Sequence, residues 1–88
     1  MQIVKRDGSK QEFSAAKIAK VVHAAGLSEE KAQELSEQVE AWFKVQASEG
    51  KKELSSLEIK DKVSSLLEKT DKYAWGLYNW YEKTKLKN

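Results

Sequence analysis

The chain opens with two short stretches on either side of an Asp-Gly dipeptide, and this arrangement predicts a β-hairpin. Residues 2–6 and 10–13 read as strands, and Asp7-Gly8 between them is a dipeptide typical of tight turns because glycine tolerates a positive φ. Residues 52–54 predict a short third strand beside the hairpin. The first part of the chain is therefore expected to form a small sheet.

Four further segments carry apolar residues at helical spacing, and each begins at a residue that caps helices well. The apolar stripes of the first three are Ile18, Val21, Val22 and Ala25, then Ala32, Leu35, Val39, Trp42 and Phe43, then Ile59, Val63, Leu66 and Leu67. The predicted starts are Ser14, Ser28, the capping box Ser55-Ser56-Leu57-Glu58, and Thr70 or Asp71. Gly26 and Gly50 end the first and second helices, and the fourth is expected to reach about Lys85.

These elements predict the fold class. We expect an α+β domain in which a three-stranded sheet, made of the hairpin and one short strand, caps a four-helix bundle. The chain has 88 residues, which is the size of one small domain, so residues 1–88 are expected to form a single unit.

Composition narrows the function classes. The net charge is only +2, from 16 cations and 14 anions, so overall charge gives no case for nucleic-acid binding. There is no cysteine, no long apolar run for a membrane span and no signal-peptide pattern, so we expect a cytoplasmic protein. The serines lack a neighbouring base and the acids are scattered, which predicts no enzyme activity and no metal centre.

The candidate chemistry is a group of cations near the hairpin. Lys5 and Arg6 precede the turn, and Lys17 lies in the first turns of the first helix, near its positive end. Together they offer point charges and a guanidinium fork to a polyphosphate. The alternative is that Lys5 and Arg6 are solvated surface charges. Lys60 is a fourth cation, or else a solvated lysine paired with Asp61 or Glu58.

Aromatic residues crowd the fourth helix and cover more than one apolar stripe. One interpretation is a core face with amphipathic rings lying on the surface. The other is a partner surface that includes Trp75 or Trp80, because aromatic side chains are enriched at interfaces. The large aromatic residues of this segment are Tyr73, Trp75, Tyr78, Trp80 and Tyr81.

Three motifs in this order resemble the ATP-cone domain, a nucleotide-sensing module at the N-terminus of many ribonucleotide reductases and in the repressor of reductase genes. The first is Val4-Lys5-Arg6-Asp7-Gly8, followed by Phe13 and by Lys17-Ile18. The second is the segment from Leu54 to Val63, and the third is Tyr78-Asn79-Trp80-Tyr81. The resemblance covers nearly the whole chain and implies a regulatory domain that binds ATP or dATP with Mg²⁺ and modulates a partner.

The resemblance also implies a set of site residues. Lys5, Arg6 and Lys17 would hold phosphates, while Ile3, Val4 and Ile18 would contact the base. Gln11 and Ser14 fall where the family reads the adenine edge, and Ser56 and Lys60 fall on positions that reach ribose or phosphate.

The chain departs from the family pattern at the end of the fourth helix. Many cones have an arginine after the second tyrosine, whereas Glu82 follows Tyr81 here, so that cation is missing or has moved to Lys83 or Lys85. This departure motivates an alternative function, a degenerate cone that no longer binds nucleotide and instead dimerises or docks onto a catalytic chain through Trp75 and Trp80. A nucleic-acid-binding domain that uses the basic C-terminal residues is a weaker alternative.

Overall fold

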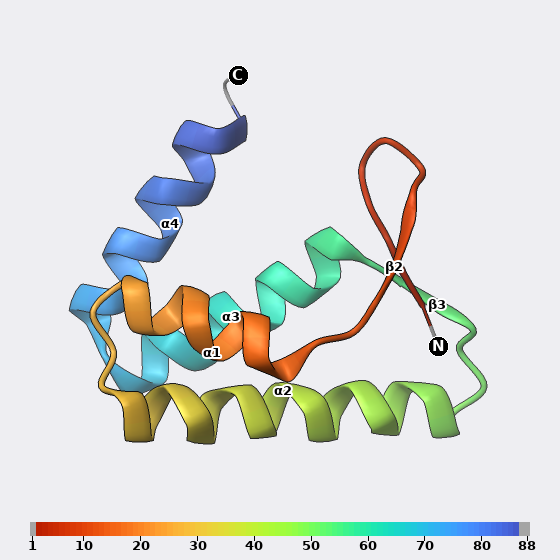
Figure 1. Cartoon of the computed structure of the whole chain (residues 1–88), viewed down its shortest axis with the longest axis horizontal. Helices are drawn as coiled ribbons and strands as arrows, with labels where there is room; N and C mark the ends of the chain where they lie inside the picture. Colours follow the sequence, from red (N-terminus) through yellow and green to blue (C-terminus); the bar gives the residue numbers. More distant parts are fainter. Residues whose placement is uncertain (1, 87–88) are drawn as a thin grey trace.

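Four helices and three short strands make up the described part of the chain (Figure 1). The computed structural model describes residues 2–86, with the side chains of residues 2–82. The elements in chain order are β1 (Gln2–Val4), β2 (Lys10–Glu12), α1 (Ala15–Ala24), α2 (Glu29–Ser48), β3 (Glu53–Ser55), α3 (Ser56–Thr70) and α4 (Lys72–Leu86). The α+β class is confirmed, with a small mixed sheet beside four helices.

The sheet has the order β2-β1-β3, with β1 antiparallel to β2 and parallel to β3. In this register Ile3 lies opposite both Gln11 and Leu54, so these three side chains share one face of the sheet. Ile3 and Leu54 are buried and Gln11 is half-buried, which makes this the face that packs on the helices.

The strands are shorter than the sequence pattern predicts. The predicted strand over 2–6 ends at Val4, because Lys5 N–H donates to Ser9 O at 2.8 Å and closes a five-residue loop. Arg6 therefore lies in the turn and not on a strand face. The predicted strand over 10–13 ends at Glu12, and the third strand is displaced by one residue from 52–54 to 53–55.

The predicted helix caps are confirmed. Ser14 and Ser28 each accept a hydrogen bond from the backbone N–H three residues later, and Ser55 forms the capping box with Glu58. The fourth helix begins after Asp71, whose carboxylate accepts from the N–H groups of Tyr73 and Ala74. These caps fix where each helix leaves its loop.

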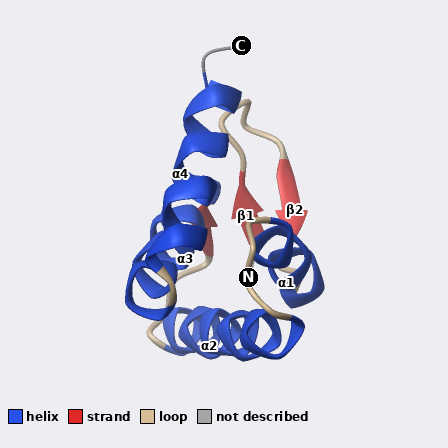
Figure 2. Ribbon diagram, turned by 90° about the vertical axis from the view of Figure 1, so that its left-hand side faces the viewer, coloured by secondary structure: helices blue, strands red, loops and turns tan. Residues whose placement is uncertain are grey.

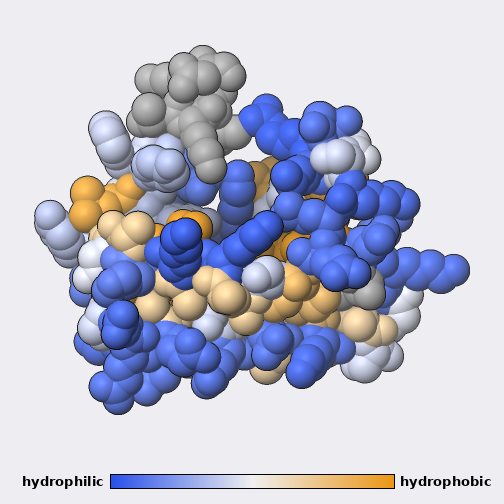
Figure 3. All heavy atoms as spheres, viewed as in Figure 1, coloured by the Kyte–Doolittle hydropathy of each residue, from blue (hydrophilic) through white to orange (hydrophobic). Residues whose placement is uncertain are grey.

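The core lies between α2 and the elements that cross it. Helix α2 runs along one side of the molecule, while the hairpin and the end of α4 rise on the other side, with α3 between them (Figures 1 and 2). Hydrophilic side chains line the outer edge of α2, and a more apolar band lies directly above it (Figure 3). The hairpin joins this core through Phe13, whose ring stacks on Phe43 of α2 at 4.4 Å between centroids. The buried apolar residues are Ile3, Val22, Leu27, Ala32, Leu35, Val39, Phe43, Leu54, Ile59, Val63, Leu67, Ala74 and Tyr78.

Candidate functional site

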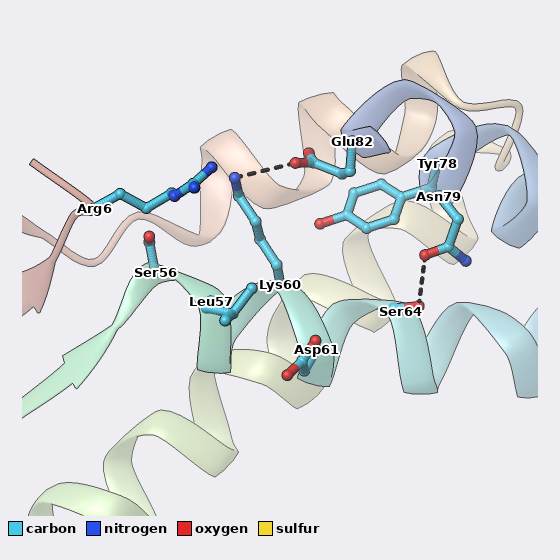
Figure 4. Close-up of a pocket in the computed structure, with 9 residues that line it drawn as sticks. All are labelled: Arg6, Ser56, Leu57, Lys60, Asp61, Ser64, Tyr78, Asn79 and Glu82. Carbon is cyan, nitrogen blue, oxygen red and sulfur yellow. Dashed lines mark hydrogen bonds and ion pairs between the residues drawn. The ribbon is translucent and has the colours of Figure 1, made fainter. Parts of the chain in front are cut away.

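A cavity of about 340 Å³ opens where the hairpin turn, α3 and α4 meet (Figure 4). Its volume is within the range typical of small-molecule sites. The turn contributes one charged side chain, α3 forms one wall and α4 the other. The residues that line it are Arg6, Ser56, Leu57, Lys60, Asp61, Ser64, Tyr78, Asn79 and Glu82.

The hairpin turn is a well-organised platform for Arg6. Gly8 has a φ of +87°, and its N–H donates to the Lys5 carbonyl at 3.0 Å, as the Asp7-Gly8 dipeptide predicts. Asp7 Oδ1 accepts from the Ser9 hydroxyl at 2.6 Å and from the Ser9 N–H at 2.9 Å. Those two hydrogen bonds, the hydroxyl first, hold the pKa of the Asp7 carboxyl below its usual value. The turn therefore places Lys5 and Arg6 in solvent on a fixed backbone.

Helix α3 presents a polar stripe to the cavity. Ser56, Lys60 and Ser64 recur every four residues, so they lie above one another on one helix face. Ser56 is the first residue of the helix, directly after the N-cap Ser55, where the helix dipole favours an anion. This end of the cavity combines the Arg6 guanidinium, the Lys60 ammonium and a helix N-terminus.

Lys60 is paired across the cavity with α4. Its Nζ lies 3.0 Å from Glu82 Oε2, and the two side chains are 38% and 15% exposed. The alternative that pairs Lys60 with Asp61 or Glu58 is wrong, because the ion pair is with Glu82. Glu58 Oε2 instead accepts from the Ser55 N–H at 2.9 Å, and the side chains of adjacent residues such as Lys60 and Asp61 do not face each other on a helix. Lys60 is accordingly half-buried and not a fully solvated lysine.

The inner end of the cavity is neutral and hydrogen-bonded. Ser64 donates to Asn79 Oδ1 at 3.2 Å and accepts from the Trp75 indole N–H at 3.0 Å. Asn79 in turn donates to the Trp75 carbonyl at 3.0 Å, so this network joins α3 to α4. Tyr78 is buried beside it, and burial together with the charges of Glu82 and Asp61 raises the pKa of its phenol.

The structure divides the predicted site residues into two groups. Arg6, Ser56 and Lys60 line the cavity together. The others lie along the hairpin and the start of α1, outside the lining of this cavity: Ile3, Val4, Lys5, Gln11, Ser14, Lys17 and Ile18.

Within the second group the environments differ. Ile3 is a core residue with 5% exposure, and Val4 and Ile18 are half-buried. The Ser14 hydroxyl accepts from the Lys17 N–H at 3.3 Å, while the Lys17 side chain is exposed in the first turn of α1. The alternative cations Lys83 and Lys85 lie outside the residues whose side chains are described.

Sequence reasoning did not place Leu57, Asp61, Ser64, Tyr78, Asn79 or Glu82 at the site. The four-residue spacing of Ser56, Lys60 and Ser64 is a signal that identifies one of them. Glu82 has no such signal, because its partner Lys60 lies 22 positions earlier in the chain and the pairing depends on how α3 and α4 pack.

A second, mostly apolar cavity of about 320 Å³ lies between α1 and α4. Trp80 and Tyr81 line it and are 65% and 53% exposed, so the prediction that α4 carries a partly exposed tryptophan is confirmed. Trp75, in contrast, is half-buried against the core. Tyr78 lines both cavities, which places one side chain of α4 between the charged site and the apolar groove.

Together the fold and the first cavity define a small α+β domain with a pocket, lined by charged residues of both signs, at the junction of a hairpin and two helices. The family model for the ATP cone domain matches residues 1–76 of this chain. The chain belongs to the ATP-cone family. The matched residues stop before Tyr78, Asn79 and Glu82, which form the α4 wall of the cavity. A search of curated proteins found no match.

Two further observations concern the described residues only. None of their helices combines the length and the apolar character that crossing a membrane requires. No group of three or more histidine, aspartate or glutamate side chains gathers among them in a way that would hold a metal ion.

Proposed function

We propose that this chain is a regulatory domain that binds an adenine nucleotide, ATP or dATP, and changes how it associates with a partner. The observation that carries the proposal is the meeting of Arg6, Ser56 and Lys60 in one cavity, from the hairpin turn and from α3. Membership of the ATP-cone family supports the same conclusion.

The phosphate chain is assigned to the cationic end of the cavity. The Arg6 guanidinium and the Lys60 ammonium provide charge-assisted hydrogen bonds, and the first residue of α3 adds the positive end of a helix dipole. Lys5 and Lys17, both exposed, extend the cationic surface along the hairpin and the start of α1. Mg²⁺ would be held mainly by the phosphates, with Asp61 as a carboxylate in the lining of the cavity.

The base is assigned to the hairpin side. Val4 and Ile18 are half-buried and offer apolar contact, with the buried Ile3 behind them. Gln11 supplies a half-buried amide, and the Ser14 hydroxyl retains its own O–H donor while it caps α1. These groups are the ones we assign to the adenine edge.

The output is assigned to α4. A nucleotide that binds two states of the domain unequally shifts their populations. Tyr78 lines both the first cavity and the apolar groove, so a change in the packing of α4 at the first alters the shape of the second. The exposed Trp80 and Tyr81 at that groove are the surface that we assign to a second copy of the chain or to a catalytic chain.

Calorimetric titration with ATP and with dATP tests the nucleotide site. Arg6→Ala and Lys60→Ala should each weaken affinity by about 1.5–3 kcal/mol, the usual range for hydrogen bonds to charged groups. Lys69→Ala is the matched control, because Lys69 is an exposed cation in the last turn of the same helix as Lys60. Unchanged affinity in both cavity variants, with native melting, would remove the nucleotide from this cavity.

Sedimentation with and without ATP tests the output. We expect nucleotide to shift self-association, and Trp80→Ala to reduce that shift while leaving ATP affinity intact. If the parent protein self-associates through Trp80 and shows no ATP binding by calorimetry, the result favours the alternative function, a domain that only mediates protein–protein interaction.

A further inference from the structure

The Lys60–Glu82 ion pair occupies the cation that the proposed ligand needs. Glu82 approaches from α4 and Lys60 from α3, so the pair spans the cavity in front of Arg6 (Figure 4). One ammonium group cannot serve a buried carboxylate and a phosphate oxygen equally well. Glu82 and an anionic ligand are therefore competitors for the same charge.

Because Glu82 is largely buried, losing Lys60 as its partner costs free energy. Its side chain is only 15% exposed, compared with 38% for Lys60, and its Oε2 is enclosed. That oxygen lies 3.0 Å from Lys60 Nζ without an aligned hydrogen bond to any described residue. If Lys60 turns to a ligand, a buried carboxylate loses its counter-charge, which is costly unless the carboxylate moves into water.

We propose that Glu82 is an intramolecular competitor for Lys60, and that an anionic ligand binds by displacing Glu82 from the cavity. This inference rests on the proposed function, because it concerns the same cavity, but it requires only that the ligand carries a phosphate chain. Displacement lowers the affinity by the free energy of breaking the pair. It also couples binding to α4, because Glu82 lies one helical turn beyond Tyr78, the residue between the two cavities.

The decisive variant is Glu82→Gln, which keeps the side-chain volume and removes the charge. Glu68→Gln is the matched control, since Glu68 is an exposed acid of α3 outside the cavity and its loss changes the net charge equally. Calorimetric titration uses inorganic triphosphate and ATP on the parent chain and both variants. Glu82→Gln should bind inorganic triphosphate at least about tenfold more tightly than the parent, within the range for charge-assisted pairs, and Glu68→Gln no more than about twofold more tightly.

Hydrogen exchange provides a second readout that affinity alone does not. In the parent chain, triphosphate should increase exchange of the α4 amides over residues 77–82, because Glu82 leaves its pair. In Glu82→Gln the pair is already absent, so the ligand should change that exchange little. Equal affinity gains in the two variants, or an identical α4 response in parent and Glu82→Gln, would overturn the proposal.

The same titrations separate this inference from the proposed function. If inorganic triphosphate shows the Glu82 effect while ATP binds no better than triphosphate, adenine recognition fails and the competitor role stands. If ATP binds through Arg6 and Lys60 and Glu82→Gln behaves like Glu68→Gln, the nucleotide function stands and the competitor role fails. If neither ligand binds the parent or Glu82→Gln, both proposals fail.

Discussion

Helix α2 and the surface around the two cavities, which we call the rim, differ in what their side chains contact. Along α2 the apolar stripe is buried in the core, with Leu35 and Val39 at 2% and 0% exposure. The rim consists of the hairpin turn over residues 5–9 and the exposed side chains of Leu77, Trp80 and Tyr81 on α4. There the large side chains remain accessible: Trp80 and Tyr81 are more than half exposed, and Lys5 and Arg6 stand in solvent.

This difference separates packing from binding. Burial in the core accounts for the apolar residues of this stripe, because burial of apolar surface is the main stabilising contribution to folding. The rim has no such explanation, because its aromatic rings and cations contribute little to the core of the domain. The rim is therefore the part of the molecule where substitutions should alter ligand or partner binding more than stability.

The largest effect on stability is expected from α2. Leu35→Ala should lower the free energy of unfolding by about 3 kcal/mol, since a buried leucine leaves a cavity as well as lost burial. Trp80→Ala on the rim is the contrasting variant and should change it by no more than about 0.5 kcal/mol. Urea unfolding followed by circular dichroism measures both. A loss at Trp80 as large as that at Leu35 would show that the rim is part of the core.

The hairpin turn should give an intermediate effect. Gly8→Val should lower the free energy of unfolding by at least about 1 kcal/mol, because φ is +87° and a β-branched residue is strained there. A Cβ at Gly8 meets no heavy atom within 4 Å, so the cost is one of backbone conformation alone.

Gly76→Ala is the matched control for the turn. Gly76 lies within α4 without a positive φ, and a Cβ there also meets no heavy atom within 4 Å. Alanine should therefore stabilise the chain by up to about 1 kcal/mol. If Gly8→Val and Gly76→Ala melt alike, the turn is not set by the positive φ at Gly8.

Local signals in the sequence account for most of the fold. Ser14, Ser28 and the Ser55–Glu58 capping box act within four residues of themselves, so their role is readable from the chain alone. The apolar pattern places the ends of β1 and β2 too far along the chain and that of β3 one residue too early. At β1 the reason is that the Lys5–Ser9 hydrogen bond, which closes the loop, leaves no trace in the apolar pattern.

The candidate site is less accessible to such reasoning. Arg6 was identified as a cation near a turn, and its meeting with Lys60 depends on where the hairpin rises beside α3. The Lys60–Glu82 pair joins residues on two different helices, so no spacing rule predicts it. What the sequence does carry is the surplus of aromatic residues on α4, which exceeds what one core face buries.

The smallest expected effect concerns the pH dependence of the turn. The Ser9 hydroxyl and N–H hold the pKa of Asp7 below its usual value of 3.8, so the ionised carboxylate is favoured in the folded hairpin. A group whose pKa is lower in the folded state stabilises that state at pH values above its unfolded pKa. This stabilisation is lost as the pH falls through the folded pKa. The Ser9 amide resonance should therefore be constant from neutral pH down to about pH 4 and shift below it, while amides of α2 near Val39 stay unchanged. Asp7→Asn retains an acceptor oxygen and cannot titrate, so its Ser9 amide should stay constant throughout. A parent and an Asp7→Asn variant with the same pH profile would show that another group organises the turn on this rim.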